Sequence, residues 1–210
     1  DVYKRQCMMF TLSAPALAES TDALMQLNIS GNRAVSVLDA ENVAEEIKIN
    51  NNVIDPADYE NIVVTPGNYT FHYDPVQKIL TSTNTTKTIN TITIEVPDDV
   101  DVVLDGKENI AVHNLTINRA HDVTISSDNY SAIGNKAEID CTGKVTINAS
   151  GNFGTYAIGA RSQADEGTLI IRNASAVEIN APQYNQVIGG RKGIADITCD
   201  GPVTIRGNAE

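Results

Sequence analysis

A two-strand unit that recurs four times constrains the fold of the second half of this 210-residue chain. The copies read LTINRAHDVTI, AEIDCTGKVTI, LIIRNASAVEI and ADITCDGPVTI. In each copy two isoleucines stand eight positions apart, and the last triplet is Val-x-Ile. Alternation of apolar and polar residues places Val and Ile on one face of a strand and the middle residue on the other. The copies therefore predict pairs of short strands that stack on one another.

A third short element follows the first three copies and reads NYSAIGNK, TYAIGAR and QYNQVIGGR. The whole unit recurs after 22, 32 and 26 residues, so the length varies between strands rather than within them. Three short strands per repeat predict one coil of a parallel β-solenoid, whereas a propeller blade needs about 40 residues. We expect two buried isoleucine columns. They are Ile117, Ile139, Ile171 and Ile197, and Ile125, Ile147, Ile179 and Ile205.

The Ile-Gly-x-cation element and the strand pair around it resemble a known repeat. It occurs in right-handed parallel β-helix segments of secreted surface proteins from gut Gram-positive bacteria, where a richer form reads GAGIGGG…GTITI…G.VTA. Residues 73–106 are similar to the entry segment of those solenoids. The resemblance implies an all-β, right-handed parallel β-helix at the cell surface, and it implies function only by analogy.

The N-terminal residues indicate the cellular location of the protein. The first six residues, DVYKRQ, resemble an adaptor-derived peptide found at the starts of gene predictions from metagenomic assemblies. Residues 7–18, CMMFTLSAPALA, form an apolar run that closes on Ala-Leu-Ala, as the rear half of a secretory signal peptide does. The run is too short to span a bilayer. We therefore expect a secreted or cell-surface protein with no membrane span.

Three segments follow from these patterns. Residues 1–18 are adaptor-like residues and a partial signal peptide, residues 19–72 a cap or small β-rich module, and residues 73–210 a parallel β-helix that we expect to continue further. Within the cap we expect a short helix at Asp39–Ile47 and strands at Ala34–Leu38, Ile62–Thr65 and Asn68–Tyr73. A cap is needed because the end of a solenoid is an open β edge.

Charge excludes one class of partner. The chain has 27 acidic and 15 basic side chains, a net charge of -12, so it lacks the excess of Lys and Arg with which proteins bind nucleic acid. Cys141 and Cys199 lie at the same coil position, and Asn173 takes that position in the coil between them. We expect two unpaired, buried thiols, because two coils separate them by about 10 Å.

Catalytic and metal-binding patterns are weak. Asp98, Asp99 and Asp101 could be paired acids or a calcium site, but Pro97-Asp98-Asp99 is also ordinary turn chemistry. The three histidines are interpreted as surface residues. We assign no catalytic residue, no metal ligand and no cofactor.

The most specific candidate site is a stripe of tyrosines and cations in the third element. We expect Tyr130, Tyr156 and Tyr184 to form an exposed row beside Lys136, Arg161 and Arg191. Such a stripe could bind an acidic, host or cell-wall polysaccharide, or it could only stabilise the outside of the solenoid. We therefore predict a non-enzymatic extracellular β-solenoid, structural or adhesive, that binds carbohydrate. The alternative is a carbohydrate-active enzyme, a polysaccharide lyase or glycoside hydrolase of the same fold.

Overall fold

The computed structural model describes residues 46–64, 69–83, 91–107, 110–151, 156–159, 167–184, 186–189 and 193–208. The chain divides into two compact units, Asp1–Ala44 and Glu45–Glu210. The first unit lies outside the described residues. The expected signal peptide, the strand predicted at Ala34–Leu38 and most of the helix predicted at Asp39–Ile47 lie there too.

Short strands dominate the second unit. They are β1 (Lys48–Ile49), β2 (Asn52–Val53), β3 (Ile62–Val64), β4 (Tyr69–Asp74), β5 (Ile79–Thr83), β6 (Thr91–Glu95), β7 (Asp101–Gly106), β8 (Val112–Arg119), β9 (Val123–Ser127), β10 (Ile133–Asp140), β11 (Lys144–Ala149), β12 (Ile158–Gly159), β13 (Thr168–Ala174), β14 (Ala176–Ala181), β15 (Ile188–Gly189), β16 (Ile194–Cys199) and β17 (Val203–Gly207). A single 3-10 turn, η1 (Pro56–Asp58), completes the described elements. In the described part of the chain, no helix is long and apolar enough to cross a membrane.

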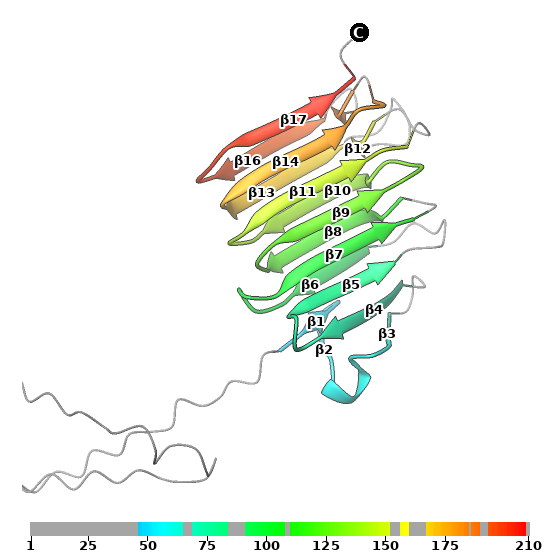
Figure 1. Ribbon diagram of the computed structural model, residues 1–210, viewed down its shortest axis with the longest axis vertical. Helices are drawn as coiled ribbons and strands as arrows, with labels where there is room; N and C mark the ends of the chain where they lie inside the picture. Colours follow the sequence, from blue (N-terminus) through cyan, green and yellow to red (C-terminus); the bar gives the residue numbers. More distant parts are fainter. Residues whose placement is uncertain are drawn as a thin grey trace, which may run out of the picture. The chain divides into compact units, whose positions relative to one another are not determined.

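The strands form two sheets that run the length of this unit (Figure 1). One sheet carries β6, β8, β10, β13 and β16, and the other carries β5, β7, β9, β11, β14 and β17. Among β5 to β17 the strands pair with one another in parallel, and each strand of the two sheets pairs with its counterpart in the next coil, whereas β1 pairs antiparallel with β6. The chain is therefore a parallel β-solenoid, as the repeats predict.

The predicted register is confirmed in both sheets. Ile139 pairs with Ile117 and Ile171, and Ile171 pairs with Ile197. On the other side Ile147 pairs with Ile125 and Ile179, and Ile179 pairs with Ile205. The first three members of each column are buried, whereas Ile197 is half-buried and Ile205 is 47% exposed. Burial is lost in the last described coil because nothing in the described chain stacks on it.

The third element also stacks, but it makes no third sheet. Ile133 pairs with Ile158, and Ile158 pairs with Ile188. The later copies form the two-residue strands β12 and β15. In β10 the same element runs on without a break into the first strand of the next coil. The three-strand coil of the prediction is thus a two-sheet coil with a short extension.

Antiparallel strands close the N-terminal end of the solenoid. β1 pairs with β2, β3 with β4 and β4 with β5, all antiparallel. The strands predicted at Ile62–Thr65 and Asn68–Tyr73 correspond to β3 and β4. Tyr69, Phe71 and Tyr73 of β4 are buried, and the Tyr69 hydroxyl donates a hydrogen bond to the Ala111 carbonyl at 2.9 Å. These aromatic rings cover the first coils of the core.

The position predicted for Asn173 is wrong. The register shifts between Ile171 and Ala174, so Ala174 rather than Asn173 pairs with Cys199. Asn173 adopts a positive φ of 60° and is exposed, and its amide donates to Asp140 Oδ1 at 2.8 Å. Cys141 and Cys199 are both free thiols, as expected, but only Cys141 is buried. Cys199 is half-buried because it lies in the last described coil.

Ile147→Asp should lower the free energy of unfolding by at least about 3 kcal/mol, because it places an unpaired carboxylate in the core. Thr124→Asp introduces the same carboxylate on an outward position of the neighbouring β9, so its effect should be small. Chemical denaturation of the parent and both variants measures the difference. Equal stabilities would contradict the buried isoleucine column.

The two thiols should differ in reactivity. Burial raises the pKa of Cys141 to about 12, so this thiol should react with a thiol-specific reagent only after denaturation. Cys199 should react in the native protein. Cys141→Ser and Cys199→Ser variants assign each signal. Only the Cys199→Ser variant should show fewer reactive thiols than the parent when the native protein is titrated. An intramolecular bridge between the two, found by mass spectrometry, would contradict the register.

Candidate functional site

The predicted tyrosine row is not exposed. Tyr156 is 5% exposed and Tyr184 is 2% exposed, and burial raises the pKa of Tyr184. Tyr130 is half-buried. The hypothesis that these rings stack on sugars needs exposed faces, and at Tyr156 and Tyr184 it is therefore wrong.

Glycine in the third element explains where one ring goes. A Cβ built at Gly189 would lie 2.1 Å from Tyr156 Cδ1, so the ring occupies the space that any side chain at position 189 would need. Tyr156 thus packs against the backbone of the following coil. The Tyr-x-Ile-Gly pattern is, at this coil, a packing device rather than a binding surface.

Of the three cations predicted to form a row, only Lys136 lies in the part of the chain that the structure describes. Lys136 pairs with Asn114 and Thr168, and its Nζ lies 2.6 Å from Glu138 Oε1. Arg161 and Arg191 lie outside the described residues. Ten positions separate Ile158 from Thr168, but only three separate Ile133 from Lys136, so the connection after the Ile-Gly element differs in length between coils.

A shallow groove of about 220 Å³ crosses three coils on the outer face of the sheet that holds β8, β10 and β13. Its lining residues are Thr116, Ile117, Asn118, Glu138, Ile139, Asp140, Ile170 and Arg172. Glu138 pairs with Thr116 on one side and Ile170 on the other, and Asp140 pairs with Arg172. Strand alternation places these side chains outward. The groove therefore combines carboxylates, a guanidinium, a hydroxyl, an amide and one aliphatic side chain.

Neighbouring groups hold the charged side chains of the groove in place. Arg172 forms an ion pair with Asp196, and its Nη1 donates to the Asp196 carbonyl at 3.0 Å. Asp140 accepts the hydrogen bond from the Asn173 amide, and Glu138 pairs with Lys136. Each charged group keeps further hydrogen-bonding capacity. Together they present fixed donors and acceptors along a flat surface.

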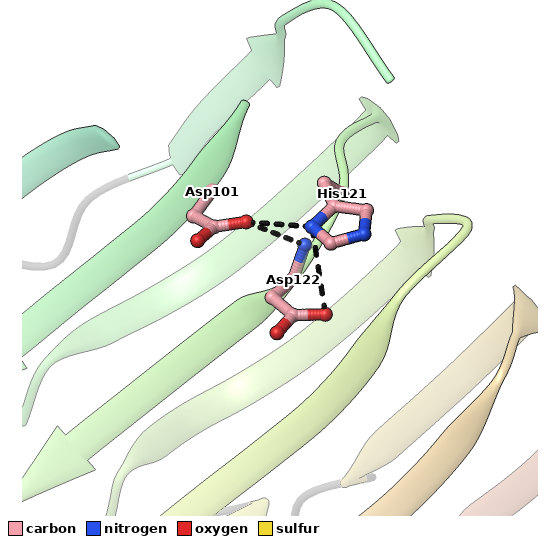
Figure 2. A group of neighbouring side chains, drawn as sticks. All are labelled: Asp101, His121 and Asp122. Atoms are coloured by element: carbon pink, nitrogen blue, oxygen red, sulfur yellow. Dashed lines mark hydrogen bonds and ion pairs between the residues drawn. The ribbon is translucent and has the colours of Figure 1, made fainter. Parts of the chain in front are cut away.

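A second cluster lies at a coil corner, where Asp101, His121 and Asp122 meet (Figure 2). His121 Nδ1 lies 2.9 Å from Asp101 Oδ1 and 3.8 Å from Asp122 Oδ1. All three side chains are between 36% and 48% exposed. The hydrogen bond that His121 donates to Asp101, with a smaller contribution from the charge of Asp122, raises the pKa of His121.

Hydrogen bonds along the corner account for this cluster. The Asp122 amide donates to Asp101 Oδ1 at 3.1 Å, and the Lys144 amide donates to Asp122 Oδ1 at 2.7 Å. Each aspartate thus joins its own coil to the backbone of the next. A Cβ at Gly143 would lie 2.1 Å from Asp122 Oδ1, so the corner requires glycine there. We call this arrangement the corner ladder.

The corner also offers the donor set of a cation site. One ligand atom from each of Asp101, His121 and Asp122 lies within 4.8 Å of the others. Carboxylate oxygens and an imidazole nitrogen suit several divalent metals. The backbone amides already occupy the two aspartate oxygens, so the hydrogen bonds explain the geometry without an ion.

Of the predicted acidic run, only Asp101 belongs to the corner ladder. Asp98 and Asp99 lie in a turn in which the Val100 amide donates to the Pro97 carbonyl at 3.1 Å, and Asp99 pairs with Lys78. This ion pair lowers the pKa of Asp99. His113, expected at the surface, is 5% exposed, because it packs against Gly134, which has no side chain.

The sequence alone predicts neither the groove nor the corner ladder. The groove depends on which outward residues share a register position, and those positions carry no common residue type. The corner had a usable signal: an aspartate directly precedes the first valine of β7 and β9, at Asp101 and Asp122. No family model, no curated protein and no solved structure matches the chain.

The pKa of His121 should exceed that of an ordinary histidine, 6.5, in an NMR titration, and Asp101→Asn should lower it. Because the folded-state pKa is raised, the protonated pair contributes stability that is complete below about pH 6.5 and disappears as the pH rises through the folded-state pKa. The contribution should stay below about 1 kcal/mol, because the pair is exposed. An Asp101→Asn variant with an unchanged titration would contradict the hydrogen bond.

Proposed function

We propose that this chain is a non-enzymatic, extracellular β-solenoid segment of a surface protein, structural or adhesive, that binds polysaccharide along the groove of β8, β10 and β13. The observation that carries the proposal is the groove itself. It crosses three coils and presents fixed hydrogen-bonding groups beside the outward Ile170. Extracellular location is supported by the apolar leader of residues 7–18 and by the resemblance to secreted surface proteins.

The shape of the groove favours a chain-like ligand. A pocket that encloses a drug-sized molecule usually has about 300–1,000 Å³, whereas this groove is smaller and open. A polysaccharide could lie across the stacked strands and contact each coil in turn. Sugar hydroxyls would donate to Glu138 and Asp140 and accept from Arg172, and a ring face could pack on Ile170.

The charges of the groove favour a neutral polysaccharide over the acidic one expected from the sequence. Two carboxylates, Glu138 and Asp140, face one guanidinium, Arg172. The net charge of the chain, -12, also repels an anionic polymer at a distance. Binding of a neutral polysaccharide should depend only weakly on salt concentration, because the ligand carries no net charge that salt could screen.

A glycan array with neutral polysaccharides (glucans, mannans, xylans) and acidic ones (uronates, sulfated glycans) tests the proposal, followed by calorimetry with the best ligand. Arg172→Gln should weaken binding at least about tenfold, because it removes hydrogen bonds made by a charged donor. Arg206→Gln is the matched control, since Arg206 pairs with Glu178 on the opposite sheet.

The control should bind as the parent does. Equal loss in the two arginine variants would indicate a general effect on the fold. Absence of binding by the parent to every array member, or unchanged binding by Arg172→Gln, would contradict the groove as the binding site.

Glycoside hydrolysis is a second candidate function, favoured by one observation. Glu138 and Asp140 stand two residues apart on β10 and line the same groove, as the two carboxylates of a glycosidase line one cleft. An enzyme would release reducing ends from the polysaccharide that binds, and Glu138→Gln would abolish the release. Under the primary proposal the parent binds the polysaccharide and releases none.

A further inference from the structure

The corner of the coil brings three side chains that can bind a metal ion to one point, an imidazole and two carboxylates (Figure 2). Asp101 is the first residue of β7, whereas His121 and Asp122 directly precede β9 in the next coil. None of the three lines the groove proposed to bind polysaccharide. The corner is therefore a separate candidate site, built from two coils.

Backbone hydrogen bonds join the two coils on either side of this corner. The His121 amide donates to the Val100 carbonyl at 2.8 Å, and the Val102 amide donates to the Asp122 carbonyl at 2.8 Å. The corner ladder then orients the carboxylates of Asp101 and Asp122. The three side chains converge without an ion, so little ordering would be needed when one binds.

The spacing of the ligand atoms suits a transition-metal ion. His121 Nδ1 lies 2.9 Å from Asp101 Oδ1 and 3.8 Å from Asp122 Oδ1. Two atoms bound to a metal at about 2.1 Å lie about 3.0 Å apart at a right angle and about 3.4 Å apart at a tetrahedral angle. The observed distances bracket these values. Shifts below about 1 Å would complete the coordination, and all three side chains are exposed enough to make them.

The charges at the corner favour a cation. Asp101 and Asp122 occupy neighbouring positions on adjacent coils, and like charges placed in this way repel each other. The next residue of the same row is Lys144, whose ammonium group forms an ion pair with Glu178 in the following coil at 2.5 Å. A divalent cation between the two aspartates would replace their repulsion with attraction to a shared charge.

We propose that the corner binds one divalent transition-metal ion, of the class of Zn²⁺, Co²⁺ and Mn²⁺, through Asp101, His121 and Asp122. One imidazole nitrogen and two carboxylate oxygens suit these ions, whereas Ca²⁺ takes about six to eight oxygen ligands. A carboxylate oxygen has two lone pairs, so each aspartate can keep its amide hydrogen bond while it binds the metal. Water would fill the remaining positions, and the ion would join the coil of β7 to that of β9.

Calorimetric titration of the untagged protein with Zn²⁺ tests the proposal, at about pH 7.5, where protons compete little for the imidazole. The parent should bind one equivalent, and His121→Ala should abolish the binding. His72→Ala is the matched control. The His72 side chain is 43% exposed, against 48% for His121, but among the described residues it faces one carboxylate, that of Glu60, at 3.5 Å. The control should bind Zn²⁺ as the parent does.

Two isosteric variants separate metal binding from the corner ladder. Asp101→Asn and Asp122→Asn each keep an oxygen that accepts the amide hydrogen bond, so circular dichroism should show the fold of the parent. Each variant should nevertheless weaken Zn²⁺ binding at least about tenfold, because even changes around metal ligands cost this much. Cys199→Ser should bind as the parent does, which excludes the free thiol of Cys199 as the ligand.

Paramagnetic Mn²⁺ locates the site without any substitution. In substoichiometric amounts it should broaden the imidazole NMR signals of His121 before those of His72. Broadening of His72 first would overturn the proposal. So would the absence of saturable Zn²⁺ binding, unchanged binding by His121→Ala, or Ca²⁺ binding as tight as that of Zn²⁺.

Discussion

In-register stacking of one coil on the next is the interaction on which the rest of this structure depends. A coil of two short strands cannot bury its own apolar face, so isoleucines such as Ile139 and Ile147 become core residues only when a neighbouring coil covers them. A shift by one residue would turn every isoleucine of a strand toward water. The corner ladder adds a second constraint at the same register, because Asp101 and Asp122 each bond the backbone of the following coil.

Repetition made the fold predictable, and local exceptions limited the prediction. The columns through Ile139 and Ile147 could be identified because their spacing is constant in every copy. Asn173 could not be placed, because a single positive φ shifts the strand and moves Ala174 into the core position. The buried position of the Tyr156 ring could not be predicted for a similar reason: counting residues does not reveal that a glycine in the following coil leaves space for the ring.

Outward positions were harder to predict than inward ones, and they form the candidate site. The two isoleucine columns repeat one residue type, whereas one outward row reads Thr93, Thr116, Glu138, Ile170 and Asp196. Such a row carries no periodic signal, because solvent accepts almost any side chain. Only the three-dimensional register shows that Glu138, Asp140 and Arg172 lie together. The proposed binding groove therefore consists of residues that the repeat leaves free to vary.

The unequal connection after the Ile-Gly element has a consequence for engineering. Three positions join Ile133 to Lys136 and ten join Ile158 to Thr168, yet Ile133 pairs with Ile158 and Lys136 with Thr168. The perimeter of a coil is thus independent of the spacing of coils along the axis. Foreign peptides inserted after Gly134 or Gly159 could be displayed at fixed intervals along one edge. Lengthening one insert would not change the spacing between coils.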